Sequence, residues 1–279
     1  MVQIGVHVSI AGSLDKAVDR ALERGCDCFQ IFTKNPRGWA AKDISEEDSA
    51  RFRNAVSMSP ISLVYAHMPY LPNLASEKPD MYQKSVDALV LELHRCSLLD
   101  IPYLVTHLGH AGDSPKSGRS RVIAAINEAI GREEGKTRLL LENTAGERNS
   151  VGSSFEDIRQ VLDRVGEPGR IGVCLDTCHA FAAGYDIRTD LAVSDLVDSI
   201  REQFEVPYIR LIHLNDAKGD LGSGLDRHEH IGCGSIGEPG IRAVLHHPDL
   251  RSIPVICETP VDEQRGDVEN IKVVRNLAG

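Results

Sequence analysis

The stretch RLLLENT, residues 138–144, sets an aliphatic run before a glutamate and then turns polar at once. Five further stretches end in the same way on His, Asp or Glu: VYAHMP (64–69), YLVTHLG (103–109), GVCLDTCH (172–179), RLIHLN (210–215) and PVICET (254–259). A parallel barrel collects the carboxyl ends of its strands at one rim, where its chemistry lies. The six endings therefore predict a barrel with a functional site at that rim.

The remainder of the chain alternates short β-like runs with amphipathic segments. Two earlier runs, QIGVHVS (3–9) and CFQIFTK (28–34), bring the expected strands to eight. The expected helices cover residues 13–25, 45–57, 78–99, 118–135, 153–166, 190–204, 238–247 and 262–279. Eight strand-then-helix units predict an α/β fold, the (β/α)8 TIM barrel. A doubly wound open sheet is the main alternative, but it usually has fewer strands and gathers its ligands at one crevice.

Length and composition favour a single barrel domain over residues 1–279. Apolar stretches stay well short of the roughly 20 residues that span a bilayer, and the N-terminus lacks the pattern of a signal peptide. Seven cysteines, an odd number without a paired framework, indicate a reducing cytoplasm. The formal net charge of −10 disfavours bulk attraction to nucleic acid, although bound metal ions can dominate the field of a deep site.

Nine residues of metal-binding type lie at or just beyond the strand ends. They are His67, His107, Glu142, Asp176, His179, His213, Asp226, His228 and Glu258. A carboxylate that faces a barrel interior is costly unless it is protonated, paired or bound to metal. Histidine with carboxylate suits zinc, manganese or iron. Nine ligands with one bridging carboxylate fit three ions, and close divalent ions suit phosphoester hydrolysis.

Two local motifs bring ligand candidates close together. In DTCHA, Asp176 and His179 stand three residues apart at a strand-to-loop turn, and in LDRHEH, Asp226 and His228 stand two apart in an extended loop. His7, at the end of the first expected strand, is a candidate for contact with the ligands or the substrate.

Several motifs resemble those of the endonuclease IV family of apurinic/apyrimidinic endonucleases. They are FTKNPRGW (32–39), LENTAG (141–146), VCLDTCHAFAAGYD (173–186), HLNDAK (213–218) and DRHEHIGCGSIG (226–237), within a match from Gly5 to about Pro260. The resemblance implies a xylose-isomerase-like barrel with three zinc ions that cleaves duplex DNA 5′ to an abasic site. The expected products carry a 3′-hydroxyl and a 5′-deoxyribose phosphate, and trimming of 3′ ends is expected as well.

The resemblance also distributes the ligands among the ions. It implies His67, His107 and Glu142 for the first zinc, Glu142, Asp176, His213 and Glu258 for the second, and His179, Asp226 and His228 for the third. Glu142 would bridge two ions, and Glu258 would orient the nucleophile. These two glutamates are the expected catalytic residues.

For damage recognition, the resemblance implies that Arg37, Tyr70 and Leu71 fill the gap left by the missing base. A planar cation, an aromatic ring and an aliphatic wedge suit that task. Lys34, Arg227 and Lys218 are expected to contact DNA phosphates. The expected partner is abasic duplex DNA, bound by a monomeric cytoplasmic protein.

A metal-dependent sugar isomerase or epimerase of the same barrel superfamily is the alternative function. Such enzymes also carry His, Glu and Asp at strand ends, but they typically use two metals and a sugar-sized pocket. The Asp226 and His228 pair and the wedge residues favour the nuclease. A sensor of DNA damage without catalysis would require a lost ligand, and all nine positions are filled.

Overall fold

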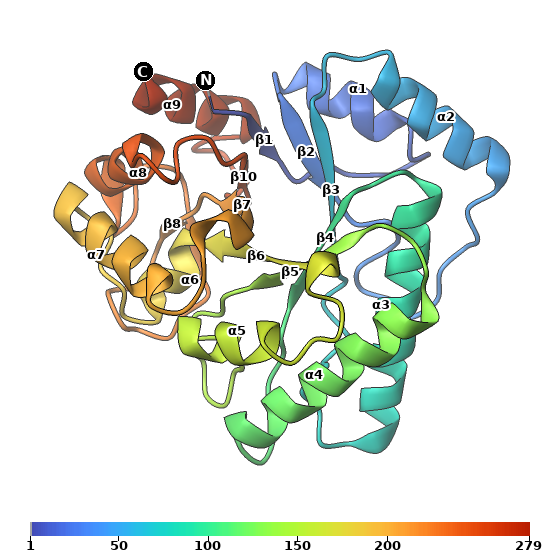
Figure 1. The fold of residues 1–279 in the computed structure, drawn as a ribbon. Helices are drawn as coiled ribbons and strands as arrows, with labels where there is room; N and C mark the ends of the chain where they lie inside the picture. Colours follow the sequence, from blue (N-terminus) through green and yellow to red (C-terminus); the bar gives the residue numbers. More distant parts are fainter. Residues whose placement is uncertain (1) are drawn as a thin grey trace.

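The parallel strands of the chain form a ring, seen in the computed structural model, which describes residues 2–279 (Figure 1). Within these residues, eight strands hydrogen-bond in the order β1-β10-β7-β6-β5-β4-β3-β2. The two ends of this order meet where His7 pairs in parallel with Gln30, and the Val8 amide donates to the Gln30 carbonyl at 2.8 Å. The predicted barrel is confirmed, and the open sheet is wrong.

Each of the eight predicted β-like runs contains a strand of the barrel. The strands are β1 (Ile4–Val6), β2 (Cys28–Ile31), β3 (Leu63–His67), β4 (Tyr103–His107), β5 (Arg138–Glu142), β6 (Ile171–Asp176), β7 (Ile209–His213) and β10 (Val255–Cys257). A separate antiparallel pair, β8 (Asp216–Ala217) and β9 (His228–Glu229), stiffens the loop after β7.

Helices surround the ring and cover its outer face (Figure 1). They are α1 (Lys16–Glu23), α2 (Glu46–Ser57), α3 (Pro79–Leu98), α4 (Pro115–Arg132), α5 (Phe155–Leu162), α6 (Thr177–Ala182), α7 (Asp190–Arg201), α8 (Gly237–His246) and α9 (Asp267–Ala278), with 3-10 turns at Pro168–Arg170 and Val206–Tyr208. In residues 2–279, no helix has the length and apolar character needed to cross a membrane.

The helices differ from the sequence prediction at several boundaries, and one short helix was not predicted. The turn after β6 was expected to be loop, but α6 begins there because the Asp176 carboxylate accepts from the His179 amide at 2.7 Å and caps the helix. Helix α4 starts three residues early, at Pro115, because the Ser114 hydroxyl caps it and proline suits a first turn.

A layer of seven buried residues fills the barrel below the rim. They are Cys28, Tyr65, Val105, Leu140, Cys174, Leu211 and Ile256. Alternate residues of a strand face the same way, so the residue two positions further along each strand also faces the interior. This next layer consists of Gln30, His67, His107, Glu142, Asp176, His213 and Glu258. The fold therefore places six of the nine predicted ligands in one plane.

Candidate metal centre

The nine predicted ligand residues converge at the carboxyl rim of the barrel. In three groups the ligand atoms lie within 4.8 Å of one another: His67, Glu142 and His213; Glu142, Asp176, His213 and Glu258; and His179, Asp226 and His228. The ninth residue, His107, joins them through its Nε2 atom, 3.0 Å from Oε2 of Glu142. The nine side chains thus form one centre, in which the first two groups share Glu142 and His213.

Glu142 is the hub of the first two groups. Its Oε2 atom lies 3.0 Å from Nε2 of His67 and 3.0 Å from Nε2 of His107, and its Oε1 atom lies 2.8 Å from Nδ1 of His213. Burial alone would raise the pKa of this carboxyl, but the charges of His107 and His213 hold the pKa well below its ordinary range. Glu142 is therefore ionised and can accept two cations at once.

The orientation of three histidines is fixed by main-chain carbonyls. Nδ1 of His67 donates to the Met68 carbonyl at 2.7 Å, and Nδ1 of His179 donates to the Asn143 carbonyl at 2.9 Å. Nδ1 of His228 donates to the Glu258 carbonyl at 3.0 Å. Because a carbonyl oxygen only accepts, each Nδ1 carries the hydrogen. The lone pair on each Nε2 is then free to bind a metal.

These lone pairs face carboxylate oxygens, and that arrangement fits a metal ion. Nε2 of His179 and Nε2 of His228 lie 3.2 Å and 3.4 Å from Oδ1 of Asp226. Both nitrogens are buried without a hydrogen-bond partner in the described residues. Two nitrogens and a carboxylate around one point form a donor set that suits zinc. Without a metal, a proton must lie between these nitrogen and oxygen atoms instead. Burial would lower the pKa of His179, but Asp176, Asp226 and Glu142 raise it to about 10.

Two buried asparagines that the sequence analysis missed hold the carboxylate ligands in place. Asn143 accepts from the Asp176 amide at 2.7 Å and donates to the Asp176 carbonyl at 3.0 Å. Asn215 donates to Oδ2 of Asp176 at 2.7 Å and accepts from the Glu258 amide at 2.8 Å. Both follow a ligand within two positions, in LENT and HLN, which is the signal that could have revealed them.

A third missed residue, Gln30, is fully buried on β2. Its amide nitrogen donates to Oε1 of Glu258 at 2.7 Å and contacts Nδ1 of His7 at 3.1 Å, while its oxygen lies 2.9 Å from Nε2 of His213. The sequence signal is a lone amide within the apolar run CFQIF. His7, a candidate in the sequence, thus reaches the ligands through Gln30.

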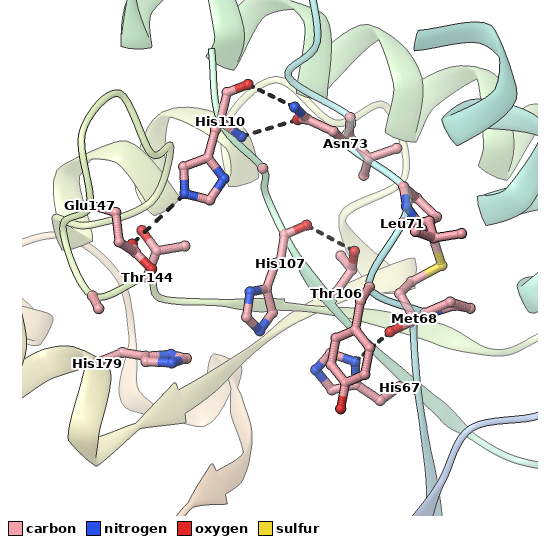
Figure 2. A pocket seen from close by; sticks show the side chains of 16 residues that line it. His67, Met68, Leu71, Asn73, Thr106, His107, His110, Thr144, Glu147 and His179 are labelled. Atoms are coloured by element: carbon pink, nitrogen blue, oxygen red, sulfur yellow. Dashed lines mark hydrogen bonds and ion pairs between the residues drawn. The ribbon is translucent and has the colours of Figure 1, made fainter. Parts of the chain in front are cut away.

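Two hollows open at the rim beside the ligands. One, of about 430 Å³, is lined by residues that include His7, Tyr70, Asp226, His228 and Glu258. The other, of about 290 Å³, has His67, His107 and His179 along one side and His110 and Glu147 along the other (Figure 2). The three ligand histidines border both hollows, so a bound molecule in either one reaches the metal centre.

Comparison with known proteins assigns the chain to a family. The family described as xylose isomerase-like TIM barrel matches residues 18–277. A protein of Methanoculleus marisnigri named "Probable endonuclease 4" is 57% identical over the whole of both chains. The structure of endonuclease IV from Thermus thermophilus is 35% identical with a TM-score of 0.87, covering 99% of this chain and 98% of that one. The chain belongs to the endonuclease IV family.

Family membership makes the chain an AP endonuclease, a metal-binding hydrolase of DNA repair. The family named in the sequence analysis is thereby confirmed. A D-tagatose 3-epimerase-like protein has a TM-score of 0.74, with coverage of 99% of this chain and 96% of that chain, but only 16% identity. That likeness shows a shared fold alone.

The expected wedge residues of this endonuclease stand at the rim and are open to solvent. Tyr70 is 70% exposed and Leu71 38% exposed, and Arg37 is exposed as well. The Tyr70 ring meets the edge of Phe32 at 5.1 Å between centroids, and Phe32 packs against His7 at 4.2 Å. The Tyr70 ring therefore projects beside the metal centre while its contact with Phe32 steadies it.

Lys34 lies differently from the other residues expected to contact DNA. It is 5% exposed, and its ammonium donates to the carbonyls of Gly38 at 2.8 Å and Trp39 at 3.1 Å. Arg95, also buried, donates to the carbonyl of Lys42 at 2.8 Å. From the inside of the fold, Lys34 thus supports the loop that carries Arg37, and its ammonium is not placed to contact a phosphate. Arg227 and Lys218 are exposed, and Lys218 lies 3.7 Å from Glu229.

Cys178 comes within ligand distance of Asp176 and His228. Its thiol donates to the Arg227 carbonyl at 3.6 Å, and burial, aided by the charge of Asp176, raises its pKa far above the ordinary range. Cys178 therefore packs beside the metal centre of the endonuclease with its thiol hydrogen-bonded to the main chain.

Proposed function

We propose that this endonuclease hydrolyses the phosphodiester on the 5′ side of abasic sites in duplex DNA with three bound zinc ions. The products carry a 3′-hydroxyl and a 5′-deoxyribose phosphate, and the same site trims blocked 3′ ends. The observation that carries the proposal is the convergence of nine candidate ligands, eight of them in three groups and His107 beside Glu142, next to a hollow bordered by the exposed Tyr70.

The proposed division of the ligands among the ions follows the resemblance, and contacts among the side chains support it. His67, His107 and Glu142 would hold the first ion, and Glu142, whose Oε1 atom lies 2.8 Å from Nδ1 of His213, would also belong to the second site. Asp176 and Glu258 complete the second site, and His179, Asp226 and His228 form the third. When bound, close divalent ions neutralise the scissile phosphate, lower the pKa of a water and stabilise the leaving oxygen.

Glu258 orients the attacking water in this proposal. Its Oε1 atom is held by Gln30 at 2.7 Å, and its Oε2 atom lies 3.3 Å from Nδ1 of His213. The side chain is 21% exposed and lines the 430 Å³ hollow, so it meets both the metal centre and the substrate. A carboxylate fixed in this way accepts a hydrogen of the water and sets its direction of attack.

The rim residues account for selection of the damaged site. Tyr70, Leu71 and Arg37 enter the stack of bases where one is missing, and the abasic nucleotide turns outward to the metal centre. Duplex DNA without a lesion resists this exchange because it must first unstack a paired base. Arg227 and Lys218 contact the phosphate backbone alongside.

The group formed by His179, Asp226 and His228 is the feature that weighs against a sugar isomerase. An isomerase with two metals has no use for a third complete ligand set. The exposed aromatic and aliphatic side chains of Tyr70 and Leu71 also have no role in a closed, sugar-sized pocket.

A nicking assay tests the proposal. Purified protein should cut an abasic oligonucleotide duplex 5′ to the lesion, lose this activity with a strong chelator, and contain about three zinc ions by elemental analysis. Glu258→Gln should abolish cutting while largely retaining binding to abasic DNA. Turnover of a free ketose with two ions per chain, or near-normal cutting by Glu258→Gln, would overturn it.

A further inference from the structure

Gln30 lies in the ligand layer of the barrel although its strand supplies no ligand. It follows Cys28 of the interior layer by two positions on β2, as Glu142 follows Leu140 on β5. It is fully buried and contacts Glu258 and His213. A polar side chain in this position needs partners for both ends of its amide, and it finds them on two metal ligands.

The hydrogen-bond directions follow from the chemistry of the neighbours. Nδ1 of His213 faces Oε1 of Glu142 at 2.8 Å and Oε2 of Glu258 at 3.3 Å. For that nitrogen to bind a metal, the hydrogen must lie on Nε2, which then donates to the Gln30 oxygen at 2.9 Å. The amide nitrogen of Gln30 is thereby turned the other way, toward Glu258 and His7.

The nitrogen end of the Gln30 amide fixes the orientation of Glu258 and His7. It donates to Oε1 of Glu258 at 2.7 Å, which leaves Oε2 directed at His213 and the metal centre. It also donates to Nδ1 of His7 at 3.1 Å, so that His7 carries its hydrogen on Nε2. A carboxamide can accept from His213 and donate to Glu258 at the same time, whereas an ionised carboxylate lacks the donor and an apolar side chain lacks both.

We propose that Gln30 is a positioning residue of the metal centre, which holds His213 and Glu258 in the orientations that bind the second ion. The identity of the ion as zinc rests on the function proposed above. Loss of a residue that orients a metal ligand typically weakens metal affinity about 10- to 100-fold. We expect a loss of this size for the second ion when the amide is removed.

The experiment compares zinc affinity among variants of the full chain. Gln30→Met keeps the approximate size of the side chain without its polar ends, and Gln30→Glu keeps the acceptor for His213 but removes the donor to Glu258. Tyr65→Phe is the matched control, because Tyr65 is buried in the same barrel interior and donates to the Arg210 carbonyl at 3.1 Å, remote from the ligands. Zinc per chain is measured against a competing chromophoric chelator, with the melting temperature recorded with and without zinc.

Gln30→Met should lose one ion at free zinc concentrations at which the wild type and Tyr65→Phe retain all of theirs. The melting temperatures of Gln30→Met and Tyr65→Phe should be similar with chelator. With zinc, the two melting temperatures should differ more. Equal zinc affinity in Gln30→Met and the wild type would overturn the proposal. If Gln30→Met fails to fold, Gln30→Glu tests the loss of the donor to Glu258 alone, and zinc affinity equal to that of the wild type would again overturn the proposal.

Nitrogen-15 spectra of the zinc-loaded wild type give a second, independent test. The imidazole signals of His213 and His7 should both show the hydrogen on Nε2, and a hydrogen on Nδ1 of His213 would overturn the proposal. A wild type that binds zinc but leaves abasic DNA intact would refute the proposed function and leave the result on Gln30 standing.

Discussion

Nε2 of His179 lies 3.2 Å from Oδ1 of Asp226, while Nδ1 of the same ring already donates to the Asn143 carbonyl. His179 belongs to α6, at the end of the β6 strand, and Asp226 belongs to a loop after β7. A cation between these two atoms makes their close approach favourable. The loop is therefore joined to the barrel through the third metal group.

This contact predicts the outcome of Asp226→Ala. The variant should bind two zinc ions per chain in place of three, because the first two groups do not include Asp226, and cutting should fall by about 100-fold or more. Elemental analysis and the nicking assay measure both effects. Asp220→Ala, an exposed carboxylate in the same loop, should change neither; retention of three ions by Asp226→Ala would contradict the assignment.

The metal-free protein should lose stability at alkaline pH. The pKa of His179 rises from its ordinary 6.5 to about 10 in the fold, so its contribution is complete below pH 6.5 and disappears as the pH rises to about 10. The pKa of Asp226 is lowered, because His179 and His228 outweigh its burial, so its contribution is present above its ordinary pKa and is lost in acid. Melting temperatures of chelator-treated protein should fall from pH 6.5 to 10. The melting temperature of zinc-loaded protein should fall less over this range, because the metal replaces the proton. Equal falls in melting temperature with and without zinc would refute this account.

Tyr70→Ala should weaken binding to abasic duplex by about 10-fold or more, since stacking on an aromatic ring contributes about 1–3 kcal/mol. Zinc content should stay at the wild-type value, because Tyr70 contacts Phe32 and not a ligand of the first two groups. Fluorescence anisotropy with abasic and intact duplexes gives the affinities. Leu191→Ala, an exposed apolar residue on α7, is the control; loss of zinc from Tyr70→Ala would show that its role is misassigned.

Lys34 and Arg227 should differ in the salt dependence of DNA binding. Each phosphate contact contributes about 0.9 to the slope of log affinity against log salt concentration. Arg227→Gln should lower the slope by about that amount. Lys34→Met should weaken binding at every salt concentration with the slope unchanged, because its ammonium supports the loop of Arg37 through the carbonyls of Gly38 and Trp39. A lower slope in Lys34→Met would restore it as a phosphate contact.

The barrel and its ligands were predictable because both follow from local patterns. A strand such as RLLLE ends on its ligand, and the carboxyl ends of parallel strands meet whatever the details of packing. Glu142 and His213 could thus be placed in one centre although 71 positions separate them. The bridging role of Glu142 stays a prediction, and its position among the ligand candidates is the observation that supports it.

Residues that act through others were not predictable in the same way. The proposed role of Gln30 depends on its contacts with Glu258 and His213, which are 228 and 183 positions away in the sequence. Whether Lys34 can reach a phosphate depends on the direction of its side chain, which is set by how the loop of Gly38 and Trp39 folds back over it. The short helix α6 escaped notice because its six residues carry no apolar periodicity, and its start depends on a cap by Asp176.

The position of β10 in the ring, between β7 and β1, has a consequence for how the protein is made. Synthesis proceeds from the N-terminus, and folding begins before the chain is complete. Glu258 follows β10 near the end of the chain, so the second metal group lacks a ligand until this last strand inserts. A chain that stops before β10 therefore lacks Glu258, and its second metal group is incomplete.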